Sequence, residues 1–181
     1  DDGAYPFFVR SQTVEHINSY SYDGEAVLTA GDGVGTGKVF HYINGKFDIH
    51  QRVYKISDFN NKLNGYYFFL YFSNNFYNRI MQMTAKSSVD SVRMEMIADM
   101  QIPLPPKPEQ EKITTALSNT DSLIASLETL IEKKRNIKQG TMQELLTGKK
   151  RLPGFSEKWD VKKLGELGKP YGGLSGKSKE D

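Results

Sequence analysis

Apolar positions in the second half of the chain recur at helical spacing over an unusually long stretch. Within residues 109–147, three series repeat every seven residues: Ala116, Leu123, Leu130 and Ile137; Leu117, Ile124 and Ile131; and Ile113, Thr120 and Leu127. Such positions form a broad stripe along one side of an α-helix. At about 1.5 Å of rise per residue, this helix would be roughly 60 Å long. A domain of about 100 residues has a radius of gyration of only ~13 Å, so we expect the helix to protrude and to bury its stripe on another helix.

Prolines and glycines mark the ends of this helix. Pro103, Pro105, Pro106 and Pro108 precede it, and because proline lacks a backbone donor they favour an extended hinge. Gly148 followed by Pro153 is the next strong stop. These signals predict three parts: a domain at 1–106, a long spacer helix at 107–150, and a separate tail at 151–181.

The first hundred residues show shorter apolar runs. Strands are predicted at 5–10 and 26–30, and a strand pair at 38–43 and 47–56 is predicted around Asn44-Gly45, a strong hairpin signal. The aromatic run at 63–75 is long enough for a helix, with 76–83 as an extension, although aromatic residues also favour strands. Residues 92–99 lead into an expected last strand at 100–104. This mixture predicts an α+β domain with a curved sheet.

Specific motifs then suggest a family. The segment PLPPKPEQEKI, the long helix ending in KKRNIKQGTMQELLTGKKRLPGF, and the Trp and LGEL that follow resemble the specificity subunit of type I restriction–modification enzymes. The resemblance is specific over residues 101–167 and looser over 3–100, which would be one target-recognition domain with a mixed β-sheet. It implies a non-catalytic subunit that reads one half of a bipartite target in double-stranded DNA.

The same resemblance implies partners. The helix would pair as an antiparallel coiled coil with a second copy, giving a homodimer, and would dock methyltransferase subunits and through them the restriction subunit. The stripe residues expected to make these contacts are Leu117, Leu123, Ile124, Leu127, Leu130 and Ile131. S-adenosylmethionine is expected only in the methyltransferase subunit, so we expect no cofactor in this chain.

Charge is divided unevenly along the chain. Residues 1–100 hold nine Lys/Arg and eleven Asp/Glu, a net charge of −2. Residues 101–181 hold fifteen Lys/Arg and eleven Asp/Glu, a net charge of +4. DNA-binding domains are usually basic on one face, so a DNA surface in the first half must come from clustering of its few cations. The alternative function is therefore a protein-interaction module that combines a coiled-coil helix with an α+β domain that does not bind DNA.

The glycine-rich run GDGVGTG at 31–37 resembles a phosphate loop only superficially. It lacks the third glycine of the dinucleotide fingerprint, and Lys38 is followed by Val39 where a P-loop has Ser or Thr. A tight turn between strands is the favoured interpretation. The family resemblance adds the option that backbone amides of this loop, with Lys38 beside them, meet DNA phosphates.

Catalytic and metal-binding patterns are absent from the sequence. It has no cysteine, its three histidines have no ligand spacing, and it contains no adenine-methyltransferase or nuclease motif. We therefore expect neither a catalytic nor a metal site. The lack of cysteine suits a reducing cytosol, and no apolar run is long enough to cross a membrane, so the expected location is cytoplasmic.

Candidate DNA-reading residues are polar or basic side chains in expected loops and on one expected strand. His50, Gln51 and Arg52 have the donor and acceptor geometry that reads base edges, whereas Lys38 and Lys86 suit phosphates. Structural alternatives remain open: Arg52 pairing with Asp48, and His50 capping a turn. The full set is Arg10, Ser11, Gln12, Thr13, Thr36, Lys38, His50, Gln51, Arg52, Lys86 and Ser87.

The tail resembles the opening of a recognition domain in this family, with Trp159 and LGEL at 164–167 as its first strand. Two arrangements stay open. Either the chain was cut from the middle of a two-domain subunit, or it is circularly permuted and the tail completes the domain formed by residues 1–106. The second arrangement requires the ends of the domain to lie close together, which is common.

Overall fold

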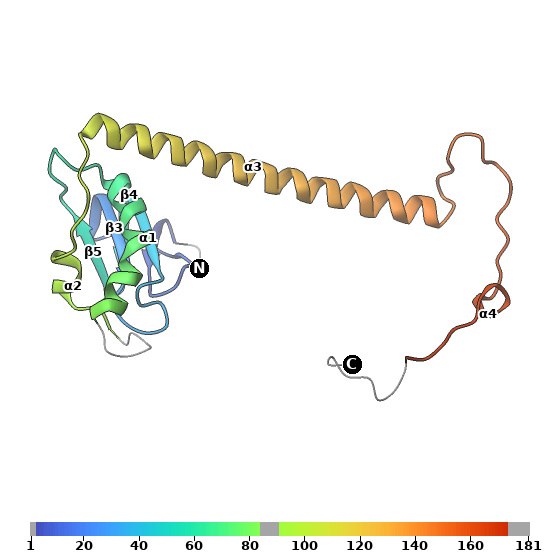
Figure 1. Ribbon diagram of the computed structural model, residues 1–181, viewed down its shortest axis with the longest axis horizontal. Helices are drawn as coiled ribbons and strands as arrows, with labels where there is room; N and C mark the ends of the chain where they lie inside the picture. The colour runs from blue at the N-terminus through green and yellow to red at the C-terminus, as the bar shows by residue number, and fades with distance from the viewer. Residues whose placement is uncertain (1–2, 84–90, 174–181) are drawn as a thin grey trace. The chain divides into compact units, whose positions relative to one another are not determined.

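The computed structural model describes residues 3–83 and 91–173. It divides into two compact units, Asp1–Leu123 and Ile124–Asp181, so that the long helix contributes to both. The first unit holds a five-stranded sheet, two helices and the beginning of the long helix. The second holds the rest of the long helix and the tail (Figure 1).

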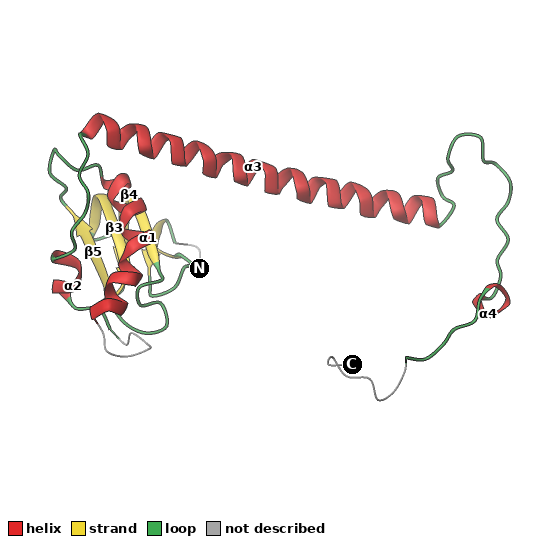
Figure 2. Ribbon diagram, in the orientation of Figure 1, coloured by secondary structure: helices red, strands yellow, loops and turns green. Residues whose placement is uncertain are grey.

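The sheet is mixed, as the sequence predicts. Its spatial order is β2-β1-β4-β3-β5, with β1 parallel to β4 and the other neighbouring pairs antiparallel. The strands, drawn in yellow in Figure 2, are β1 (Tyr5–Phe8), β2 (Glu15–Ile17), β3 (Tyr22–Ala30), β4 (Phe40–Ile49) and β5 (Val53–Ser57).

The hairpin predicted at Asn44-Gly45 is wrong. Strand β4 continues through both residues and pairs with β3 from Thr29↔Phe40 to Tyr22↔Phe47. Gly45 lies directly opposite Gly24, and both have positive φ values, 148° and 133°. The two glycines therefore allow a local distortion of the paired strands that a residue with a side chain rarely adopts. A turn-forming dipeptide is used here inside a strand.

The sheet must coil strongly. Strand β4 ends beside the Tyr22 end of β3, whereas β5 begins opposite Ala30 at the other end. A flat strand of this length would separate those ends by about 27 Å at ~3.4 Å per residue. The link from Ile49 to Val53 can span at most ~15 Å. Coiling accordingly brings Phe8, Phe47 and Val53 into one buried cluster, although they come from β1, β4 and β5.

Helix α1 (Gly65–Met83) covers one face of the sheet (Figure 1) and confirms the helix predicted at 63–75 with its extension. Phe68, Phe72, Phe76 and Ile80 recur every four residues and are buried. The rings of Phe72 and Phe76 are 4.3 Å apart, and Phe40 of β4 packs edge-on against Phe72 at 5.4 Å. This apolar stripe overrides the β-propensity of its aromatic residues, because helical spacing directs them all to the sheet.

The strand predicted at residues 100–104 is absent. Helix α2 (Met94–Ala98) ends just before it, and residues 100–106 run on without pairing to a described strand. Prolines at 103, 105 and 106 cannot donate to a ladder. The segment is held instead by a side chain, because Tyr67 Oη of α1 donates to the Pro103 carbonyl at 3.0 Å.

Helix α3 (Lys107–Leu146) confirms the long helix. Pro108 lies in its first turn, where a missing donor costs no hydrogen bond. Gly148, with φ 72°, follows its last turn, and the Lys150 amide donates back to the Glu144 carbonyl at 3.1 Å. None of the described helices, α3 included, is long and apolar enough to cross a membrane.

The tail does not form the strand predicted there. LGEL is one helical turn, α4 (Leu164–Leu167), and its leucines are exposed. Nearer to α3, the Arg151 guanidinium lies 5.0 Å from the Trp159 ring centroid and donates to the Glu157 carbonyl at 2.7 Å. These contacts order the chain just after the helix.

Candidate nucleic-acid interface

Three of the loops singled out by sequence lie close together beside the sheet. They are residues 9–14 after β1, residues 31–38 after β3, and residues 50–52 between β4 and β5; together they are called the loop cluster. The Gly31 amide donates to the Arg52 carbonyl at 2.8 Å, which joins the second loop to the third. His41 Nε2 lies 3.0 Å from the Ser11 carbonyl, and Gln12 Nε2 donates to the Phe40 carbonyl at 3.4 Å. These two bonds fasten the first loop to β4.

An ion triad ties the loop cluster together. Asp32 accepts from Arg10 Nη1 through Oδ1 at 2.7 Å and from Arg52 Nη1 through Oδ2 at 2.6 Å. The hydrogen bond from Arg10 is the largest influence that lowers the pKa of Asp32, and Arg52 adds to it. The carboxylate thus stays ionised and holds two cations side by side. Both arginines remain solvent-accessible, with 43% and 55% of their side chains exposed.

Glycines let the second loop pass close to the first. A Cβ on Gly35 would lie 2.4 Å from the Arg10 carbonyl oxygen, so only glycine fits there. Gly33 and Gly37 have φ values of 77° and 67°, which also favour glycine. The loop is therefore a tight turn, as the sequence favours, and its shape places Asp32 between the two arginines.

The loop's own groups use part of its hydrogen-bonding capacity. The amides of Thr36, Lys38 and Val39 donate to carbonyls within the loop at 3.0 Å each. The Thr36 hydroxyl donates to the Gly33 carbonyl at 2.6 Å, and this residue is only 3% exposed. Thr36 therefore holds the loop together and presents almost no surface to a ligand. Lys38 is exposed, with Nζ 5.6 Å from the Tyr77 ring centroid of α1.

The turn at 50–52 differs from its prediction. Gln51 and Arg52 lie in a turn and not on a strand, and both are exposed. His50 caps this turn, since its Nδ1 accepts from the Arg52 amide at 3.2 Å. Asp48, which the structural alternative pairs with Arg52, accepts instead from Ser21 Oγ and from the Ile49 amide. The Arg52 side chain pairs with Asp32 and not with Asp48.

A shallow hollow of about 310 Å³ adjoins the triad. Two hydrogen bonds fix its lining, because the Val92 amide donates to the Gly31 carbonyl at 2.7 Å and the Tyr54 hydroxyl donates to the Val92 carbonyl at 3.0 Å. The hollow is lined by Gly31, Asp32, Gln51, Arg52, Val53, Tyr54, Ser91 and Val92. The loop cluster therefore offers hydrogen-bond donors beside a depression.

Some functional candidates fall elsewhere. Lys86 and Ser87 lie outside the described residues. Asp32, which organises the two arginines, was not predicted, because an acidic residue inside a glycine-rich loop is typical of a turn. Its pairing with residues about twenty positions away leaves no pattern in the sequence. Within the described ranges, 3–83 and 91–173, no group of His, Asp and Glu could hold a metal ion.

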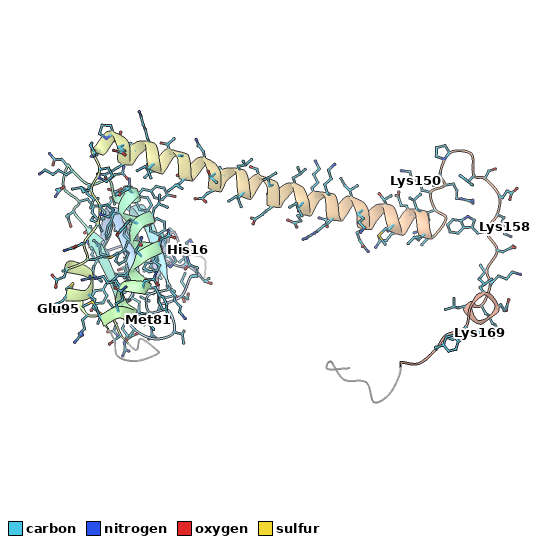
Figure 3. The ribbon with its side chains drawn as sticks, in the orientation of Figure 1. His16, Met81, Glu95, Lys150, Lys158 and Lys169 are labelled. Carbon is cyan, nitrogen blue, oxygen red and sulfur yellow. The ribbon has the colours of Figure 1, made fainter. Side chains whose placement is uncertain are left out.

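The predicted apolar stripe of α3 lies open. Each of its six residues has between 46% and 59% of its surface exposed, and Figure 3 shows side chains standing out along the helix. Half-exposed leucine and isoleucine side chains at this regular spacing are typical of an association surface. The residues are Leu117, Leu123, Ile124, Leu127, Leu130 and Ile131.

Comparison with known proteins agrees with this architecture. Residues 1–138 match the family model described as the type I restriction modification DNA specificity domain. The chain belongs to this family. The match takes in the sheet, α1, α2 and most of α3, so it places the loop cluster and the stripe within one specificity domain.

Curated relatives of this specificity domain carry consistent names. The chain is 31% identical over 152 residues to the type I restriction enzyme EcoDI specificity subunit of Escherichia coli, covering 82% of this chain and 33% of that protein. It is 28% identical over 177 residues to the putative type I restriction enzyme MjaX specificity subunit of Methanocaldococcus jannaschii, covering 91% and 39%. The chain thus matches only between 33% and 39% of the length of these relatives.

Solved structures show the same fold. The S subunit of the M. genitalium type I restriction–modification system aligns with a TM-score of 0.52 at 17% identity, over 79% of this specificity domain chain and 38% of that one. A chain from a study of complex assembly and conformational transition of the type I restriction–modification system aligns with a TM-score of 0.54 at 18% identity. The alignment covers 80% of this chain and 38% of that one. The α+β fold with a mixed sheet and a long helix is confirmed, whereas pairing of the helix stays a prediction.

Proposed function

We propose that this chain is the DNA-reading, non-catalytic specificity component of a type I restriction–modification system, and that its loop cluster contacts double-stranded DNA. The observation that carries the proposal is the ion triad: a domain with net negative charge holds two exposed arginines together on one carboxylate. The family match supports the assignment of DNA as the ligand. No comparison favours a protein-interaction module without DNA binding.

The chemistry of the triad suits DNA. A guanidinium has five N–H donors in a planar fork, and Asp32 occupies one donor nitrogen of each arginine. The remaining donors can read O6 and N7 of guanine or clamp a phosphate. Because Asp32 fixes both side chains beforehand, less rotamer entropy is lost when DNA binds. Gln51 lies next to Arg52 in the same turn and would read adenine, while Lys38 would contact phosphate.

Catalysis would belong to partner proteins. Methyltransferase subunits would bring S-adenosylmethionine and transfer the methyl group, and they would connect this chain to the restriction subunit. The open apolar stripe of α3 supports a helical partner, since leaving that many apolar side chains in water is unfavourable.

The stripe also supports self-association. We propose that two copies pair through α3 in antiparallel fashion, so that two loop clusters read the two halves of a palindromic, bipartite target. Relatives that are two and a half to three times as long as the matched part have room for a second such unit within one chain. A second copy of this chain would supply it here.

Electrophoretic shift assays test the proposal. The chain, with and without the methyltransferase subunit of its own system, is mixed with a pool of random duplexes, and the bound fraction is sequenced. Enrichment of one sequence that disappears in Arg52→Ala but persists in Lys62→Ala, a change at an exposed lysine outside the loop cluster, supports the proposal. If the bound fraction shows no preferred sequence, either with or without the methyltransferase subunit, the proposal is contradicted.

A further inference from the structure

One buried polar side chain joins the long helix to the domain. Among the described residues of α3, only Gln110 and Thr114 are buried. Gln110 is 0% exposed, which is unusual for glutamine. It lies one turn into the helix, at the point where α3 leaves the domain. This place, formed by residues 60–67 and 103–114, is called the helix–domain junction.

Every polar atom of the Gln110 amide is engaged. Its Oε1 accepts from the Asn64 amide at 2.9 Å, and its Nε2 donates to the carbonyls of Lys62 and Pro105, each at 2.8 Å. These partners fix the orientation of the amide, since a flipped group would set N–H against N–H. One side chain therefore links the helix, the proline-rich linker and the loop that enters α1.

The linker at this junction is stiff for independent reasons. Tyr67 Oη donates to the Pro103 carbonyl at 3.0 Å, and the Tyr67 amide donates to Asn64 Oδ1 at 2.9 Å. The amides of Glu109 and Gln110 both donate to the Pro106 carbonyl. Proline also fixes φ near −65°. Little rotation is left in the chain between Pro103 and the first turn of α3.

Just beyond the junction, the first turns of α3 lie across a groove from α1. A groove of about 380 Å³ lies between α1 and α3, with Tyr67, Leu70 and Tyr71 on one side and Ile113, Leu117 and Asp121 on the other. Apolar contacts are non-directional, and here they are sparse. The directional hydrogen bonds of Gln110 consequently decide the angle at which α3 leaves.

That angle has a large effect because the helix is long. For a helix of roughly 60 Å, a swivel of about 10° moves one end by about 10 Å. Base pairs along B-DNA are about 3.4 Å apart, so this movement equals about three base pairs. A protein that reads two half-sites through domains on paired helices must hold the angle far more tightly than that.

We propose that Gln110 is a positioning residue that fixes the direction of α3 at the helix–domain junction and thereby sets the spacing of the half-sites in the DNA target. The part about spacing rests on the proposed function. The part about direction rests only on the contacts of Gln110.

Pulsed electron spin resonance tests the direction without DNA. The chain has no cysteine, so Asn44→Cys on the sheet and Asn119→Cys on α3 can be spin-labelled cleanly; both side chains are exposed. Labelled protein is diluted with unlabelled protein to remove distances between copies. Gln110→Met fills a similar volume without hydrogen bonds, Gln110→Glu keeps only the acceptor, and Gln139→Met, at an exposed glutamine of the same helix, is the control.

The native chain and Gln139→Met should give one narrow distance distribution, and Gln110→Met should at least double its width while circular dichroism stays native. If Gln110→Met does not fold, Gln110→Glu provides the same comparison. A native width in the folded Gln110 variant, or equal broadening in Gln139→Met, overturns the proposal. Failure of both Gln110 variants to fold also overturns it, because Gln110 would then belong to the core.

Sequencing of methylated sites, with the methyltransferase subunit present, tests the spacing. The native chain should methylate targets with a single spacer length, and Gln110→Met should methylate targets with several adjacent lengths. A single length in a variant whose distance distribution has broadened overturns the link to spacing. If the native chain directs no sequence-specific methylation, the proposed function fails, while the resonance result still decides the role of Gln110.

Discussion

At the scale of single residues, the loop cluster depends on one carboxylate shared by two arginines. Asp32 holds Arg10 and Arg52 from loops that are far apart in the sequence. Exposed ion pairs contribute little to stability, so the triad is better explained by the arrangement that it gives to two guanidinium groups. We therefore expect the triad to contribute to DNA binding and not to stability.

Replacing Asp32 should separate affinity from selectivity. In Asp32→Asn the arginines lose their common anchor and the surface loses one negative charge. Binding to random DNA should strengthen and depend more steeply on salt, while discrimination between the target and a single mismatch should fall by about 1–3 kcal/mol. Fluorescence anisotropy over a salt series measures both quantities. Unchanged discrimination would show that Asp32 plays no part in recognition.

The low pKa of Asp32 gives a second residue-scale prediction. Its hydrogen bond from Arg10 lowers the pKa below 3.8, the usual value for aspartate. A depressed folded-state pKa means that the triad's stabilisation is complete above about pH 4–5 and is lost only as pH falls through the lowered value. DNA binding should therefore not change through ionisation of Asp32 between pH 5 and 8. A transition in that range that vanishes in Asp32→Asn would contradict this assignment.

At the scale of elements, local pattern predicted helices better than strands. Helices α1 and α3 follow from long apolar periodicity, which tertiary structure rarely overrides. Asn44-Gly45 has the best local turn signal, yet β4 runs through it, because eight pairs with β3, including the one between Gly24 and Gly45, outweigh a two-residue preference. Asp32 could not be predicted as a site for a similar reason: its partners are brought near only by the coiling of the sheet.

Replacing either of two glycines near α3 by alanine should change the stability of the helix, but in opposite directions. Gly140 lies inside α3 with open space around a would-be Cβ. Gly140→Ala should stabilise the helix by about 0.5–1 kcal/mol. Gly148 follows the helix with φ 72°, so Gly148→Ala should instead destabilise it by roughly 1 kcal/mol. Urea denaturation followed at 222 nm distinguishes the two, and equal effects would contradict the described helix end.

At the scale of the whole molecule, the distribution of exposed apolar surface supports the proposed assembly. The sheet and α1 form a well-packed core, whereas the stripe of α3 is half-exposed over its length. An isolated helix with this much apolar surface in water is unfavourable, and pairing with another helix would bury that surface. Sequence predicted the stripe fully, because helical periodicity is local. It could not show the hollow beside the triad, which depends on contacts among three loops and Val92.

Charge placed in the stripe should dissociate the assembly. Ile124→Asp with Leu127→Asp should convert a dimer at tens of micromolar into a monomer, because two buried carboxylates would lack partners. Thr129→Asp, on the opposite side of the helix, should leave the dimer intact. Light scattering gives the mass of each. A native chain that is monomeric at these concentrations would rule out self-pairing through α3.

The central claim, that the loop cluster reads DNA for a partner enzyme, is tested most directly by sequencing the sites methylated by the complex of this chain with the methyltransferase subunit of its own system. The native chain should direct methylation to one target sequence. Arg10→Ala and Arg52→Ala should each relax the requirement at one or a few positions of that target, whereas Lys62→Ala should not. If both arginine variants methylate the native target with native selectivity and rate, the loop cluster is not the DNA-reading surface.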